Sequence, residues 1–237
     1  MIPKSNAPPE ISVVMIAMNE ESAVAQVIGQ IRESSPLAEI VVVDSSTDRT
    51  AEIATSLGAR VIKQFPPRGY GRAMELALRS ATGKVVITLD CDATYPAQEI
   101  PALAREVLEG GQDLVDASRL KSRPNAMPLV NYCANIGFAW IASLLFWRRM
   151  TDLHSGMRAY RRTMIEELSF DPSGPALPVD LLLIPIKLGY KVKTRFIDYH
   201  ERVGQSTMQP LPSAWWTLKR ILRTRFARID HNGVSGA

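Results

Sequence analysis

Short runs of uncharged, strand-forming residues alternate with helical patterns along the first half of the chain. The runs are rich in Val and Ile, as in strands buried on both faces of a sheet, and lie at 11–17, 40–43, 60–63 and 85–89. The segments between them place apolar residues three or four positions apart, as along one face of a helix. This alternation predicts an α/β fold with a largely parallel, doubly wound sheet that is flanked by helices on both faces.

The second half continues the alternation and ends in a polar, basic segment. The expected elements of this half are helices over 96–109, 129–147 and 179–188 and strands over 113–117 and 192–199. Pro185 should interrupt the last of these helices. We divide the chain into a flexible N-terminal arm over 1–10, one α/β domain over 11–206, and a basic amphipathic C-terminal helix and tail over 207–237.

Two carboxylates one residue apart follow the run at 85–89. Asp90 and Asp92 come at the end of this strand, and Pro96 prevents the strand from continuing. In an open α/β sheet, ligands bind at the carboxyl ends of the strands, and two Asp side chains offer the oxygen ligands that Mg²⁺ and Mn²⁺ prefer. The pattern therefore indicates a site for a metal and a diphosphate. The alternative is that Asp90 caps the helix beginning near Pro96 and that Asp92 is a solvated turn residue.

Composition excludes several classes of protein. With 46% hydrophobic and 22% charged residues, the 237-residue chain has the composition of a globular protein and not that of a disordered one. The net charge of +4 suits an anionic substrate or an acidic membrane surface. The chain carries no nucleic-acid recognition motif, so we expect no nucleic-acid partner. Its cysteines, Cys91 and Cys133, lack C-x-x-C spacing, and we expect reduced thiols in a cytoplasmic setting.

Two segments raise the question of membrane contact. Residues 129–147 carry no charge and could just span a bilayer. Because Asn131 and Asn135 share one helical face, we favour a half-buried helix that touches a membrane surface. Residues 213–228 form a basic amphipathic helix with Trp215 on its apolar stripe, which suits anionic lipid. The alternative for this helix is a terminal element packed on the core with a solvated basic face.

Seven short motifs follow one another between residues 11 and 206. They are Asn19-Glu20-Glu21, 42–48 (VVDSSTD), Arg68-Gly69-Tyr70-Gly71, Asp90-Cys91-Asp92, Ser118-Arg119, 152–160 (DLHSGMRAY) and 202–206 (RVGQS). In this order they resemble the motifs of the family 2 glycosyltransferases of the GT-A fold, and among them the dolichyl- and polyprenyl-phosphate sugar synthases. The resemblance implies a GT-A, Rossmann-like fold for 11–206 and transfer of a hexose from a nucleotide diphosphate sugar.

The resemblance also implies roles for individual residues. Asp90 and Asp92 would hold the divalent metal, Mg²⁺ or Mn²⁺, which neutralises the charge developing on the leaving nucleotide. Arg202 lies on a late loop that can close over the phosphates and exclude water, and we count it with Asp92 as catalytic. The donor would contact Ala17, Asn19, Glu20, Asp44, Arg72, Asp90, Cys91 and Asp92, and the acceptor would contact Arg119, Arg123 and Ser206.

The acceptor separates two interpretations. In the first, which we favour, an inverting enzyme transfers the hexose to polyprenyl or dolichyl phosphate while bound peripherally at the cytoplasmic membrane face. In the second, the acceptor is a soluble hydroxyl compound, such as a glycan or a secondary metabolite. We include Asp180 among the catalytic residues, because with a hydroxyl acceptor it could act as the general base. A phosphate acceptor scarcely needs a general base. A hypothesis from another class is a nucleotide-sugar-binding protein without turnover.

Overall fold

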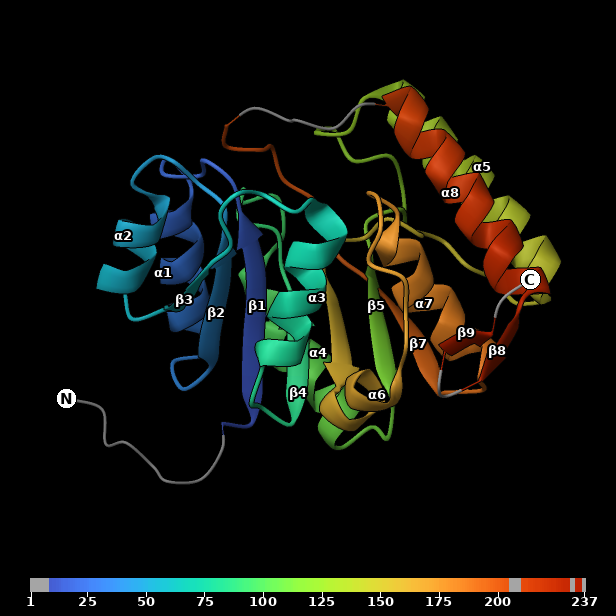
Figure 1. Cartoon of the computed structure of the whole chain (residues 1–237), viewed down its shortest axis with the longest axis horizontal. Helices are drawn as coiled ribbons and strands as arrows, with labels where there is room; N and C mark the ends of the chain where they lie inside the picture. Colours follow the sequence, from blue (N-terminus) through green and yellow to red (C-terminus); the bar gives the residue numbers. More distant parts are fainter. Residues whose placement is uncertain (1–8, 205–209, 231–232, 236–237) are drawn as a thin grey trace.

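A seven-stranded sheet forms the centre of the protein (Figure 1). The computed structural model describes residues 9–204, 210–230 and 233–235. In spatial order, the strands are β3 (Arg60–Lys63), β2 (Glu39–Asp44), β1 (Ile11–Ala17), β4 (Val85–Thr88), β6 (Arg158–Arg161), β5 (Leu114–Ser118) and β7 (Val192–Phe196). Neighbouring strands are parallel except at β6, which is antiparallel to both β4 and β5. The predicted α/β fold with a mostly parallel sheet is confirmed.

The hydrophobic pattern does not predict β6. Its four residues, Arg-Ala-Tyr-Arg, begin and end with a charge. Arg158 is nevertheless only 1% exposed, because its Nε donates to Oδ1 of Asp116 in β5 at 2.6 Å and its Nη2 donates to the backbone oxygen of Leu153 at 3.1 Å. Here the buried ion pair between Arg158 of β6 and Asp116 of β5 takes the place of apolar contact between the strands. The hydrophobic pattern of the sequence does not predict such a pair.

Helices cover both faces of the sheet. One face packs against α1 (Val24–Ser34), α2 (Thr50–Ser56) and α4 (Ile100–Leu108), which follows a 3₁₀ turn at Ala97–Glu99, and the other against α3 (Tyr70–Ser80), α6 (Arg162–Glu167) and α7 (Leu177–Lys187). Val13 and Val14 of β1 point into these two different cores, as the alternation of a strand requires. Helix α7 continues through Pro185, so the expected interruption is wrong. Packing of its buried apolar residues outweighs the hydrogen bond that proline removes.

Helix α8 (Pro210–Phe226) packs against α7 and against a further helix, α5 (Leu129–Phe146) (Figure 1). By length and composition α5 could cross a membrane, and 11% of that span is buried, so α5 is more exposed than the expected half-buried helix. Lys187 Nζ of α7 donates to the backbone oxygens of Thr224 and Arg225 at 2.7 and 3.0 Å, which caps the C-terminal end of α8. A short hairpin, β8 (Arg228–Asp230) and β9 (Gly233–Ser235), follows α8.

The N-terminal arm expected over 1–10 is described only at its end. Residues 1–8 lie outside the described residues. The backbone oxygens of Pro9 and Glu10 accept hydrogen bonds from the backbone nitrogens of Lys84 and Val85 at 3.3 and 2.9 Å. The hydrogen bonds between this part of the chain and the start of β4 therefore begin at Pro9, two residues before β1.

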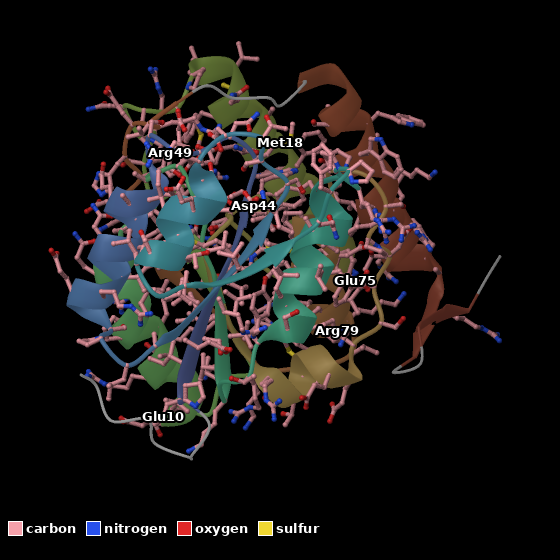
Figure 2. All side chains as sticks on the ribbon, turned by 60° about the vertical axis from the view of Figure 1, so that its left-hand side comes forward. Glu10, Met18, Asp44, Arg49, Glu75 and Arg79 are labelled. Atoms are coloured by element: carbon pink, nitrogen blue, oxygen red, sulfur yellow. The ribbon has the colours of Figure 1, made fainter. Side chains whose placement is uncertain are left out.

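The carboxyl ends of the parallel strands and the loops that follow them form one edge of the sheet. Figure 2 shows Met18, after β1, and Asp44, at the end of β2, towards the same end of the molecule as Arg49, whereas Glu10 lies at the opposite end. Because β6 is antiparallel, the segment that precedes it reaches the same edge. The loops that meet there include 18–23, 45–49, 89–96, 119–128, 152–157 and 197–204. This is where ligands bind in open α/β sheets.

Candidate active site

Asp92 is held firmly in the loop that follows β4. It is 2% exposed, and its Oδ1 accepts hydrogen bonds from the backbone nitrogen and the hydroxyl of Thr94 at 3.1 and 2.6 Å. Its Oδ2 pairs with Arg202. The helical turns that follow have no side-chain cap. The alternative interpretation, in which Asp90 is a helix cap and Asp92 a solvated turn residue, is therefore wrong.

Asp90 is enclosed by the segment that leads into β6. A Cβ at Gly156 would lie 2.8 Å from both Cγ and Oδ1 of Asp90, so this close approach requires glycine. Gly156 is itself fixed, because its backbone nitrogen donates to the Tyr95 hydroxyl at 2.7 Å. Burial, followed by the charge of Asp92, raises the pKa of Asp90 to about 7, although nearby arginines act in the opposite direction. A half-buried carboxylate beside a buried one is a position that a cation would stabilise.

The loop after β7 lies over the two carboxylates. Arg202 pairs with Asp92, and the backbone nitrogen of Val203 donates to the backbone oxygen of Asp92 at 3.0 Å. The backbone nitrogen of His200 donates to the backbone oxygen of Thr94 at 2.9 Å. The structure thus brings Arg202 to the carboxylate pair, and its guanidinium supplies positive charge where the sequence predicts a metal.

The loops after β1 and β2 are joined by hydrogen bonds and form one wall of the site. The backbone nitrogen of Asn19 donates to Oγ of Ser46 at 2.8 Å, and its Oδ1 accepts from the backbone nitrogen of Thr47 at 3.0 Å. The backbone oxygen of Ala17 accepts from the backbone nitrogen of Ser45 at 2.9 Å. Asn19 has a φ of 60°, a conformation that Asn adopts more readily than most residues. Ala17 and Asn19, both predicted donor contacts, therefore belong to this wall.

Glu20 lies between this wall and the carboxylate pair. Burial, and then the charges of Asp92 and Asp90 acting against Arg202, raise its pKa to about 7. A Cβ at Gly204 would lie 3.6 Å from Oε2 of Glu20, so the loop after β7 reaches Glu20 as well as Asp92. The charge of Glu20 consequently interacts with those of three other predicted site residues, Asp90, Asp92 and Arg202.

Asp44, at the end of β2, is fully buried and already paired. Its Oδ1 accepts from the backbone nitrogen of Ser46 at 3.3 Å, and its Oδ2 pairs with Lys63 of β3. Lys63 lies opposite Asp44 in the register of β2 and β3. The sequence motifs do not indicate Lys63, whose one signal is its position at the end of a strand. A nucleotide base approaching Asp44 would therefore meet an ion pair.

The remaining predicted donor and acceptor residues differ in accessibility. Cys91 is 3% exposed, packs in the core and has a thiol pKa raised by burial, so only its backbone could contact a donor. Arg72 is exposed on the first turn of α3, and Arg123 is exposed in the loop after β5. Ser206 lies outside the described residues.

Arg119 lies in the interior, contrary to the prediction that it binds the acceptor. Its Nε and Nη2 donate to Oδ2 and Oδ1 of Asp152 at 2.7 and 3.0 Å, and its side chain is 9% exposed. Although burial acts to raise it, the pKa of Asp152 is held at about 2 by Arg119. Because Asp152 occupies the Nε–Nη2 edge of the guanidinium and the side chain is buried, we assign Arg119 to a structural ion pair.

Asp180 is also placed differently from its predicted role. It is 4% exposed, its Oδ2 pairs with Arg220, and its Oδ1 accepts from the Thr224 hydroxyl at 3.1 Å. Burial raises its pKa to about 6, although Arg220 acts in the opposite direction. Both partners belong to α8, so the carboxylate is directed at that helix. A general base must reach the proton that it removes, and this position contradicts that role for Asp180.

The carboxylates Asp90 and Asp92 fit a divalent cation as a two-ligand site. Within 9–204 and the described part of the C-terminal segment, no three His, Cys, Asp or Glu side chains gather closely enough to hold a metal by themselves. Mg²⁺ and similar ions commonly take one or two carboxylates from a protein and complete their shell with water and substrate phosphates. The raised pKa of Asp90 fits this chemistry, because a bound cation would favour the ionised form.

Comparison with known proteins identifies the family. Residues 12–169 match the family described as Glycosyl transferase family 2. The chain belongs to this family. Dolichyl-phosphate hexose transferase of Haloferax volcanii is 39% identical to this glycosyltransferase over 202 residues, covering 85% of this chain and 87% of that protein. The low-salt glycan biosynthesis hexosyltransferase Agl6 of the same organism is 32% identical over 225 residues, covering 92% of this chain and 54% of that protein.

Solved structures with the same fold include glucosyl-3-phosphoglycerate synthase from Mycobacterium tuberculosis. Its complex with phosphoglyceric acid superposes with a TM-score of 0.72 at 26% identity, covering 92% of this chain and 80% of that one. Its complex with Mn²⁺, UDP-glucose and glycerol 3-phosphate gives a TM-score of 0.69 at 25% identity, covering 91% and 78%. The GT-A fold and the assignment as a glycosyltransferase, both expected from the sequence motifs, are confirmed.

Proposed function

We propose that this glycosyltransferase transfers a hexose from a nucleotide diphosphate sugar, such as GDP-mannose or a UDP-sugar, to polyprenyl or dolichyl phosphate, with Mg²⁺ or Mn²⁺ as cofactor. The observation that carries the proposal is the enclosed pair Asp90 and Asp92 with Arg202 placed on Asp92. Similarity to a dolichyl-phosphate hexose transferase supports the lipid acceptor. The neighbour crystallised with Mn²⁺ and UDP-glucose supports the metal and the nucleotide donor.

In the proposed reaction, Asp90 and Asp92 are the residues that would hold the cation. A cation at this position neutralises the charge that develops on the leaving nucleotide. To hold the cation, Asp90 would be ionised and Asp92 would no longer be paired with Arg202. Arg202 can then pair with a phosphate oxygen, because its loop remains anchored through His200 and Val203. The same loop excludes water, which would otherwise hydrolyse the donor.

The position of Asp180 favours a phosphate acceptor over a hydroxyl acceptor. A hydroxyl nucleophile has to lose its proton to a base, and Asp180, the base predicted from the sequence, is engaged by Arg220 and Thr224. A lipid phosphate is already anionic and can attack the anomeric carbon directly. Positioning of the two substrates and stabilisation of the leaving nucleotide are then sufficient for an inverting displacement.

Exposed apolar side chains on α5 and α8 support action at a membrane surface. Each member of this set is at least 41% exposed: Val130, Trp140, Leu144, Trp147, Trp215, Leu222 and Phe226. Single exposed apolar residues are common, but two adjacent helices that share so many, three of them tryptophans, are typical of a membrane or protein contact. Exposed basic residues at 121, 123 and 149 flank α5 and suit anionic lipid. We infer peripheral binding through α5 and α8 at the cytoplasmic membrane face.

Transfer of labelled sugar into lipid tests this proposal. The protein is incubated with Mn²⁺, radiolabelled UDP-glucose or GDP-mannose, and anionic vesicles that contain polyprenyl phosphate. We expect label to enter the organic phase, and we expect Asp92→Asn to abolish this transfer while Glu109→Gln, an exposed carboxylate at the end of α4, leaves it unchanged. Label found only on soluble hydroxyl acceptors would reject the lipid phosphate. Donor binding without transfer to either acceptor would reject an enzyme acting on this substrate class.

A further inference from the structure

Helix α8 places Ile221 in the core, but it also buries polar side chains and exposes apolar ones. Thr217, Arg220 and Thr224 are each at most 2% exposed, whereas Trp215 and Phe226 are 68% and 70% exposed. A helix that merely covers a core buries its apolar stripe and leaves its polar face in water. Buried polar groups require hydrogen-bond partners, and the partners of Thr217 and Arg220 lie in the two segments that pack against the proposed donor site.

Thr217 contacts the segment that packs against Asp90. The Thr217 hydroxyl donates to the backbone oxygen of Ser213 at 2.9 Å. Its single proton is thereby used, and the 2.8 Å contact with His154 is assigned as a hydrogen bond from Nε2–H to the Thr217 oxygen. Nδ1 of His154 is buried and has no partner among the described residues, which fits a neutral ring with its proton on Nε2.

The residues between His154 and Asp90 are tightly packed. The backbone nitrogen of His154 donates to Oδ1 of Asp152 at 3.0 Å, and the backbone nitrogen of Gly156 donates to the Tyr95 hydroxyl at 2.7 Å. Gly156 leaves no room for a Cβ beside the Asp90 carboxylate. The His154 ring and the Gly156 backbone thus belong to one closely held segment, and Asp90 packs against that segment.

Arg220 acts on a second segment, the loop at 171–174. Its Nη1 pairs with Asp180, and its Nη2 donates to the backbone oxygen of Ser173 at 2.5 Å. The same loop touches the start of α3, because a Cβ at Gly71 would lie 2.8 Å from the backbone carbon of Pro172. Gly71 belongs to the Arg68-Gly69-Tyr70-Gly71 motif, so α8 reaches this motif through one intervening loop.

We propose that α8 positions the donor site through its buried polar face. Thr217, acting through His154, positions the Asp90 carboxylate, and Arg220, acting through the loop at 171–174, positions the start of α3. Both are positioning residues, since neither touches the reacting atoms. The proposal rests on the proposed function in one respect, that Asp90 is a ligand of the cation.

Substitutions at Thr217 test the first of these connections. Thr217→Val keeps the shape of the side chain but removes the acceptor of His154, whereas Thr217→Ser keeps the hydroxyl. The matched control is Thr55→Val on the exposed end of α2, where the Thr hydroxyl likewise donates four residues back, to Ala51 at 2.7 Å. Affinities for Mn²⁺ alone and for Mn²⁺ with UDP or GDP are measured by titration calorimetry on each folded variant. We expect Thr217→Val to weaken Mn²⁺ binding by about tenfold, the lower end of the loss that follows removal of a direct partner of a metal ligand, because Thr217 acts on Asp90 indirectly. We expect Thr217→Ser and Thr55→Val to bind as the wild type.

Arg220→Met tests the second connection by a different readout. This second connection ends at α3 and not at Asp90. We therefore expect Arg220→Met to weaken nucleotide binding and raise the donor KM, while the affinity for Mn²⁺ alone stays within about twofold of that of the wild type. If Arg220→Met does not fold, the Thr217 series decides. Thr217→Val that melts at a lower temperature yet binds Mn²⁺ with wild-type affinity would overturn the proposal, because Thr217 would then serve stability alone. Failure of the wild type to bind Mn²⁺ with either nucleotide would instead reject the proposed function.

Discussion

Gly156→Ala should separate the metal site from the stability of the fold. The added Cβ would lie 2.8 Å from Cγ and Oδ1 of Asp90, whereas ordinary contacts begin at 3.4 Å. The carboxylate must therefore retreat by more than about half an ångström, and displacements of this size at a reacting site cost roughly ten- to a hundredfold in rate. The atoms in the way are the end of a side chain, so the backbone can stay in place, and we expect the free energy of unfolding to change by less than about 1 kcal/mol.

The assay for Gly156→Ala compares Mn²⁺ affinity, sugar transfer and thermal melting with those of Gly29→Ala. A Cβ at Gly29, in α1, would meet nothing within 4 Å, so this control repeats the chemical change without the contact. We expect Gly156→Ala alone to lose at least tenfold in Mn²⁺ affinity and in transfer, with a melting temperature within a few degrees of the wild type. Wild-type Mn²⁺ binding and transfer by Gly156→Ala would refute the view that the observed position of Asp90 is the one the reaction uses.

Three further predictions concern charge, pH and the membrane. Arg202→Met should leave the affinity for Mn²⁺ alone unchanged or higher, because it removes a competing positive charge, but it should lower sugar transfer by about a hundredfold. A parallel loss of Mn²⁺ affinity and of transfer, measured by titration and by rate assays, would contradict this division of roles. The pKa values of Glu20 and Asp90 are raised to about 7, so these carboxylates bind protons more tightly in the folded state than in the unfolded chain. The metal-free protein should therefore lose stability as the pH rises from about 5 to 8. Melting curves should show this loss and its reversal by Mn²⁺, and a melting temperature that does not change with pH would count against the raised pKa values. Trp215→Ser should reduce flotation with anionic vesicles severalfold, whereas Leu37→Ser, which alters a residue 77% exposed between α1 and β2, should not; equal effects would reject α8 as the contact.

Elements defined by local pattern could be predicted from the sequence. The buried strands read as short apolar runs, and the helices on the sheet read as amphipathic segments, because both signals depend on neighbours in the chain. The meeting of Glu20 and Asp90 also followed from sequence, once the ends of parallel strands were expected to meet at one edge, and the family resemblance implied that Arg202 lies near them. Strand β6 could not be predicted in this way, because its burial depends on a cross-strand ion pair between Arg158 and Asp116.

The polar partnerships of the site could not be predicted in the same way. Asp180 lies in the first turn of α7, and nothing near it in the chain indicates that Arg220 would occupy its carboxylate. Arg119 follows a strand at the correct edge, yet Asp152, far along the chain, directs it inward. A charged residue at the active edge can serve either the substrate or a buried partner, and only the three-dimensional arrangement distinguishes these roles.

The most direct test of the central claim is a crystal structure obtained with Mn²⁺ and either UDP or GDP, with anomalous scattering used to locate the metal. We expect an anomalous peak next to Asp90 and Asp92 and the diphosphate, with Arg202 moved from Asp92 to a phosphate oxygen. A nucleotide bound at the sheet edge with Arg202 still on Asp92, and with no manganese between the two carboxylates, would contradict it.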